Sequence, residues 1–278
     1  MVNMQNNNRS SASGFTIDNA LRAVFYFLMR DWKKYLMIAL PASACIIFII
    51  YMFFNDLAAL PDVSSLPPEQ QFEVYLPYWQ RAVLNMIISG IVSVPVSSLI
   101  AFGVMQGFCG EIFSIREGFY YLQRQILSLV ALSILSVSMI NIGFLLLLIP
   151  GFILMILMLP IIPVCFLEQR GVLSSIRRSI QLMSPMKTSL QSLMLVILVW
   201  IGIYMIKVGL TFFIETSPYL YIALIVLMEA VSMSVLSVLV TVIYFYVLFD
   251  GERKNAAYIA AQMRQREVPF SENDNSGE

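Results

Sequence analysis

Long apolar stretches without charge alternate with short polar stretches along most of this chain. The first run, residues 35–54, has 20 residues; as a helix it would extend about 30 Å, the thickness of the hydrocarbon layer of a bilayer. The run 126–167 has 42 uncharged residues, which is too long for one crossing, so it must fold back. We predict an all-α polytopic membrane protein with six spans, at about 35–54, 82–105, 126–148, 152–167, 190–214 and 219–249.

The longest apolar run contains a proline followed directly by a glycine, Pro150-Gly151, near its middle. Proline ends a helix because it lacks the backbone N–H, and glycine accepts backbone conformations that other residues avoid. We therefore predict that the hairpin turn between the third and fourth spans lies at Pro150 and Gly151.

Small residues recur along the second predicted span and favour close packing against another helix. The stripe continues as a GxxxG pattern and consists of Ser89, Ser93, Ser97, Ala101, Gly103 and Gly107. An ordinary packing seam within the chain, a homodimer face and a permeation path are all compatible with it.

Two segments that precede spans have the pattern of amphipathic helices. Residues 16–34 place Leu21 and Phe25 on one face and end in two lysines, and residues 168–188 combine apolar residues with Arg177 and Arg178. We predict that both lie along the cytoplasmic surface of the membrane. The pairs Leu21-Arg22 and Ile176-Arg177 suggest an internal duplication, although two amphipathic helices can also resemble each other by chance.

The remaining segments are polar. Residues 1–14 are predicted to form a disordered N-terminal tail, residues 55–80 an outer loop, and residues 251–278 a cytoplasmic C-terminal tail. Residues 15–250 then form one transmembrane domain.

The distribution of basic residues predicts the orientation. With both termini inside, only Arg81 and Lys207 of the 17 Lys and Arg lie outside the inner segments. The inner basic residues are Arg9, Arg22, Arg30, Lys33, Lys34, Arg116, Arg124, Arg170, Arg177, Arg178, Lys187, Arg253, Lys254, Arg264 and Arg266. The positive-inside rule therefore places both termini on the cytoplasmic side of the membrane.

Composition narrows the classes of function. Hydrophobic residues make up 59% and charged residues 12% of the chain, which fits a membrane protein. Seventeen Lys and Arg balance 17 Asp and Glu, so nucleic acid is not an expected partner. Histidine is absent and the three cysteines form no CxxC pair, so we expect no metal, no cofactor and no catalytic residue of the common hydrolytic types.

Two charges lie within predicted spans. Lys207 and Glu229 are at similar distances from the turn that joins the last two spans. An unpaired charge inside a membrane is costly, so we predict that the two form an ion pair. A structural clamp and a transport or relay role both remain open for it.

A polar cluster follows the fourth predicted span. It contains Glu168, Arg170, Arg177, Arg178 and Ser179. A salt-bridged corner, a site for anionic lipid and a docking site for a cytoplasmic protein are three interpretations of this cluster.

The stretch 145–183 resembles the membrane domain of some bacterial glycerophosphodiester phosphodiesterases and the YciC-like stand-alone inner-membrane proteins. The matching positions are Ile149-Pro150-Gly151, Glu168, Gly171, Arg177-Arg178-Ser179 and Leu182. The resemblance implies a six-helix membrane body of unassigned activity. In the enzymes, catalysis belongs to a separate soluble barrel with histidines and acidic metal ligands, which this chain has no room for, so their activity is not expected here.

Three classes of function remain. The first is a non-enzymatic membrane or envelope protein that binds the bilayer, anionic lipid at its cytoplasmic face or a partner protein. The second is a transporter subunit resembling a permease, although the segment 168–188 lacks the usual ATPase-docking pattern. The third, an intramembrane enzyme, has the least support because the spans contain no facing aspartates or Ser-Lys pair.

Overall fold

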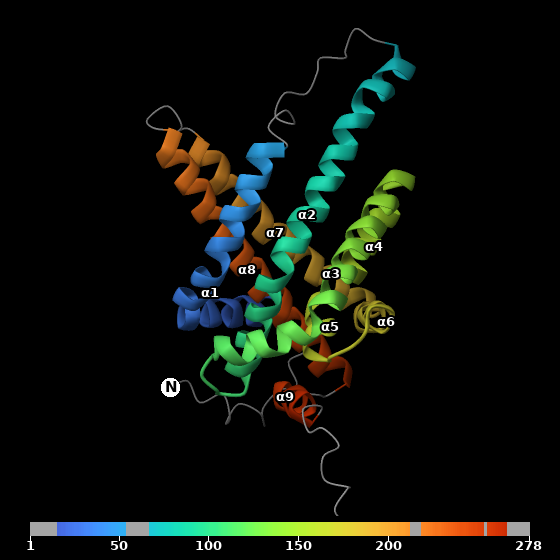
Figure 1. Ribbon diagram of the computed structural model, residues 1–278. Helices are drawn as coiled ribbons and strands as arrows, with labels where there is room; N and C mark the ends of the chain where they lie inside the picture. The colour runs from blue at the N-terminus through green and yellow to red at the C-terminus, as the bar shows by residue number, and fades with distance from the viewer. Residues whose placement is uncertain (1–15, 54–66, 212–217, 253–254, 266–278) are drawn as a thin grey trace, which may run out of the picture.

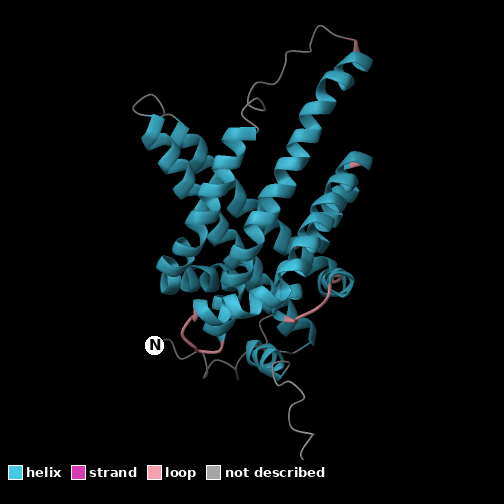
Figure 2. Cartoon of the chain, viewed as in Figure 1, coloured by secondary structure: helices cyan, strands magenta, loops and turns pink. Residues whose placement is uncertain are grey.

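The protein is helical throughout the part that the structure describes. The computed structural model describes residues 16–53, 67–211, 218–252 and 255–265, which contain helices and no strands (Figure 2). The helices are α1 (Ile17–Phe53), α2 (Pro68–Phe108), α3 (Ile115–Leu146), α4 (Leu148–Met158), α5 (Ile161–Leu167), α6 (Val172–Met183), α7 (Met186–Thr211), α8 (Pro218–Glu252) and α9 (Ala256–Gln265). Six segments are long and apolar enough to cross a membrane, with α4 and α5 together forming one of them. This confirms the predicted class, an all-α integral membrane protein.

The crossing helices pack around α2 and α8. The helix α8 contacts α1, α2 and α7, while α2 also contacts α3, which forms a hairpin with α4. The first half of α1, α6 and α9 all lie toward the lower end of the molecule in Figure 1, which we call the α9 end. Buried side chains such as Leu99 and Ile100 of α2 and Leu239 and Val242 of α8 form the core.

The first helix is bent at Asp31, whose backbone angles (φ −122°, ψ 19°) are not helical. The part before the bend runs crosswise to the bundle, and the part after it runs along the bundle (Figure 1). The predicted amphipathic segment and the first predicted span are therefore one helix with a bend.

The predicted turn at Pro150 and Gly151 is wrong by about three residues. The chain reverses at Leu147, which is extended (φ −160°, ψ 147°), and both Pro150 and Gly151 are helical residues of α4. Proline suits this place because the first helical turn does not need its N–H. Gly151 is required for close packing, since a Cβ there would lie 2.8 Å from the backbone nitrogen of Phe144.

Three other boundaries differ from the predictions. The fourth crossing is interrupted at Leu159 and Pro160, between α4 and α5. The helix α2 begins at Pro68, within the predicted outer loop, and α9 lies within the predicted C-terminal tail. The predicted tail 1–14, residues 55–66 of the loop and the last residues of the chain, 266–278, lie outside the described residues.

Candidate functional site

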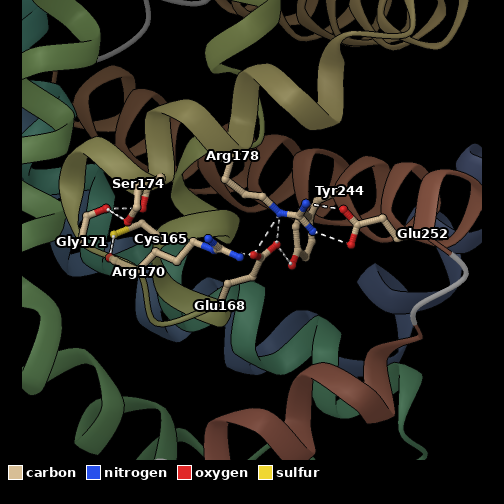
Figure 3. Close-up of polar contacts among 9 residues, drawn as sticks. Cys165, Glu168, Arg170, Gly171, Ser174, Arg178, Tyr244 and Glu252 are labelled. Atoms are coloured by element: carbon tan, nitrogen blue, oxygen red, sulfur yellow. Dashed lines mark hydrogen bonds and ion pairs between the residues drawn. The ribbon is translucent and has the colours of Figure 1, made fainter.

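Glu168 is the centre of a polar cluster at the α9 end (Figure 3). It is buried directly after α5, and the next residue, Gln169, has a positive φ of 53° that turns the chain toward α6. Its carboxylate accepts hydrogen bonds from Arg170 Nε at 2.7 Å, from Arg178 Nε at 3.1 Å and from the Tyr244 hydroxyl at 3.1 Å. The charge of Glu168 is thus compensated by two guanidinium groups and one hydroxyl.

Arg178 joins this cluster to the end of α8. While its Nε contacts Glu168, its Nη2 donates to Glu252 Oε2 at 2.7 Å and its Nη1 donates to the other oxygen of Glu252. The hydrogen bond to Glu252 raises the pKa of Arg178 further above its usual range, although burial opposes this. Arg178 therefore stays charged and connects α6 to the end of α5 and to α8.

The other predicted members of the cluster have separate roles. The Ser179 hydroxyl donates to the backbone oxygen of Leu157 at 2.6 Å and so holds α6 against α4. Cys165, which was not a predicted member of the cluster, donates through its thiol to the backbone oxygen of Arg170 at 3.3 Å. Arg177, in contrast, is exposed and takes no part in the Glu168 cluster. Tyr244 and Glu252 were not predicted as members of the cluster, because they lie more than 70 residues away from it on a different helix.

The helix α6 presents three different faces. Ser175, Ser179 and Leu182 are buried against the protein. Leu173 and Ile180 point away from it, with Leu173 77% exposed. The third face lies between these two around the helix axis. It carries the exposed polar residues Ser174, Arg177 and Gln181.

The first half of α1 has the same three faces. Ala20, Val24 and Phe27 are buried, whereas the apolar residues Leu21, Phe25, Met29 and Trp32 are exposed. Asp18, Arg22 and Lys33 form an exposed polar face. A side chain such as Phe25, 61% exposed beside a charged face, needs a cover that the described part of the chain does not provide.

Lys207 and Glu229 are in contact across α7 and α8. Lys207 Nζ lies 2.5 Å from Glu229 Oε2, and the side chains are 36% and 29% exposed. The pair borders a cavity of about 270 Å³ that Tyr204 and Tyr221 also line. The two charges therefore satisfy each other at the edge of the bundle, half open to the surroundings.

The small-residue stripe of α2 is covered by its own chain at several positions. The Ser97 hydroxyl lies 2.9 Å from that of Ser237 on α8, and Ala101 is fully buried. Gly103 faces Phe113, and Gly107 faces Phe27 and Arg30 of α1. Ser89 and Ser93 are half-buried and bond within α2, to Asn85 and to the backbone oxygen of Gly90. At its lower part the stripe is thus a seam within the chain.

No set of three or more Cys, Asp or Glu residues within the described ranges is placed to hold a metal ion. No model of a known protein family matches the chain, and the searches of curated proteins and of solved structures also gave no match.

Proposed function

We propose that this protein is a non-enzymatic component of a bacterial inner membrane that binds anionic lipid along α6 and the first half of α1. The three-faced arrangement of α6 is the observation that carries the proposal. A helix with one face on protein, one apolar face uncovered and one basic face in water fits the boundary between lipid tails, headgroups and cytoplasm.

The positions of the basic residues support the same orientation. Arg177 on α6 and Arg22 and Lys33 on α1 lie on the exposed polar sides of the two helices, beside exposed apolar residues. Basic side chains at the cytoplasmic headgroup level attract anionic lipids, at about 1 kcal/mol for each Lys or Arg. The α9 end would then be cytoplasmic, as the positive-inside rule also predicts. The proposal agrees with the resemblance to YciC-like membrane proteins.

A membrane transport role is the second candidate. It is favoured by the Lys207 to Glu229 pair beside its small cavity, because charges within spans often mark the path of an ion or substrate. The pair satisfies itself, however, and its cavity is small, so we rank transport below lipid binding.

Reconstitution into lipid nanodiscs tests the lipid proposal. The full chain is placed in phosphatidylcholine discs with and without phosphatidylglycerol, and the thermal unfolding midpoint is measured. We expect phosphatidylglycerol to raise the midpoint, and the double variant Lys33→Gln/Arg177→Gln to lose most of that gain. Arg81→Gln is the matched control, because Arg81 lies in the half of α2 that is farther from the α9 end. This variant should keep the rise in midpoint that phosphatidylglycerol causes.

Leu173 provides an independent test of where α6 lies. Because Leu173 is 77% exposed with respect to the protein, Leu173→Gln removes little internal packing. If this side chain enters the hydrocarbon layer, the variant unfolds at a lower temperature in nanodiscs. Equal midpoints for Leu173→Gln and the parent, or an unchanged lipid effect in the double variant, would refute the proposal.

A further inference from the structure

A cavity lies at the α9 end, away from the Glu168 cluster. It has a volume of about 620 Å³, is open on part of its surface, and is lined by the end of α2, the start of α3 and α9. Gly110, with a positive φ of 76°, turns the chain after α2 so that residues 111–114 lead back along the cavity. Its size falls within the range of small-molecule binding sites in proteins.

One side of the cavity is apolar. Phe102 and Met105 of α2 and Met263 of α9 contribute to it, and each of these residues is buried. Ala260 of α9 also lines the cavity. A hydrocarbon or ring system placed here would replace water on apolar surface, which favours binding.

Next to these apolar residues, Gln106 of α2 forms a fixed set of hydrogen bonds. Gln106 is only 3% exposed, and both ends of its amide are in use. Its nitrogen donates to Glu117 Oε2 at 2.9 Å, and its oxygen accepts from the backbone N–H of Ser114 at 2.8 Å. This set of hydrogen bonds is therefore already in place before any ligand arrives.

Among the described residues that line the cavity, Arg116 is the basic residue without an ion pair. Arg264 pairs with Glu111 at 2.7 Å, and Glu117 already accepts from Gln106. Arg116 lines the cavity, is exposed and forms no ion pair with any residue in the described ranges. It is placed in the first turn of α3, where the helix dipole adds positive potential.

The helix α9 forms one wall of the cavity. Apart from its apolar side, it is held by the ion pair of Arg264 and Glu111, whose side chains are 61% and 37% exposed. Exposed ion pairs contribute only about 0–1 kcal/mol, so the buried side chains of Ile259, Ala260 and Met263 hold α9 in place more than this pair does.

We propose that this cavity binds an amphiphilic anion, with one carboxylate or phosphate group at Arg116 and an apolar body against Phe102, Met105 and Met263. The site is separate from α6 and does not depend on the lipid-binding role proposed above.

The proposal is tested by measuring the thermal midpoint of the full chain in a neutral detergent with three added probes. Dodecyl phosphate carries both parts of the proposed ligand, inorganic phosphate carries only the anion, and dodecanol carries only the chain. We expect a concentration-dependent rise with dodecyl phosphate and none with the other two. Arg116→Gln should weaken the apparent affinity by at least about tenfold, because it removes a charge-assisted hydrogen bond.

Arg81→Gln is the matched control and should bind dodecyl phosphate like the parent. A response to inorganic phosphate as large as that to dodecyl phosphate would show that the apolar side is not used, which overturns the proposal. An equal response to dodecanol, or unchanged affinity in Arg116→Gln, would show that the anion is not recognised and overturns it as well. Each of these results leaves the phosphatidylglycerol experiment on α6 unaffected, so the two proposals fail separately.

Discussion

Replacing Lys207 by glutamine leaves the Glu229 carboxylate without its partner inside the membrane. The two residues are joined by a single contact of 2.5 Å between Nζ and Oε2. Lys207 lies four residues before the end of α7, or about 6 Å along the helix axis, whereas Glu229 lies eleven residues, or about 16 Å, after the start of α8. A lysine can extend its side chain toward the headgroups, but a glutamate at this depth cannot.

The expected cost follows from this geometry. Breaking a fully buried ion pair costs about 3–5 kcal/mol. About a third of each side chain is exposed, so we reduce this to about 2 kcal/mol for Lys207→Gln. For Glu229→Gln we expect about 1 kcal/mol, because the remaining lysine can reach the outer headgroups. A chain of this size loses about 2–4 °C of unfolding temperature per kcal/mol, which gives a loss of about 4–8 °C for Lys207→Gln.

The assay is thermal unfolding in nanodiscs of the two single variants and of the charge swap Lys207→Glu/Glu229→Lys. The swap should regain most of the stability that the single reversals Lys207→Glu and Glu229→Lys lose, since it restores an ion pair between α7 and α8. A swap as unstable as the worse single reversal would refute the clamp. If the parent protein transports a substrate and a stable swap variant does not, the result would instead favour membrane transport, the second candidate function.

Three more predictions concern the scaffold. Glu168→Gln should destabilise the protein by about 3 kcal/mol, because the buried Glu168 carboxylate supplies the negative charge that Arg170 and Arg178 contact, whereas Glu252→Gln should cost less because Glu252 is 27% exposed. Chemical unfolding in detergent measures both. Gly151→Ala should cost about 1–3 kcal/mol through the clash with Phe144. Gly202→Ala should be neutral or stabilising, because a Cβ there meets nothing within 4 Å. Thermal melts of both variants measure this, and equal midpoints for the two would contradict the packing assigned to Gly151. A green fluorescent protein fused to the C-terminus should fluoresce and an alkaline phosphatase fused there should be inactive; the reverse pattern would contradict the cytoplasmic orientation.

Much of the membrane body was predictable from the length of the apolar runs. A run of 42 uncharged residues leaves no alternative to a reversal, and six crossing segments are present. The position of the reversal was not predictable, because Pro150 is equally suited to ending a helix and to the first turn of the next one. Packing decided between these, through the close approach of Gly151 to Gly143.

The candidate sites were predictable only where sequence distance carries geometric information. Lys207 and Glu229 stand at similar distances from one turn, so counting residues along antiparallel helices placed them near each other. Tyr244 and Glu252 reach Glu168 and Arg178 from α8 through the tertiary fold, which residue spacing does not encode. The helix α9 could have been predicted from the spacing of apolar residues in the sequence. Its buried residues, Ala256, Ile259, Ala260 and Met263, follow the helical spacing i, i+3, i+4 and i+7.

The burial patterns bear on the suspected internal duplication in a way that the sequence alone did not. When Leu21 is aligned with Ile176, the buried residues Ala20, Val24 and Phe27 fall on the buried Ser175, Ser179 and Leu182. Arg22 and Arg177 then occupy the same place on the exposed polar face. Both segments present protein, apolar and polar faces in the same rotational order, and both lead into a crossing helix. A duplication whose copies are related by an axis along the membrane normal requires that both copies share this order. A copy inserted upside down would instead move one of the two basic faces to the opposite membrane surface.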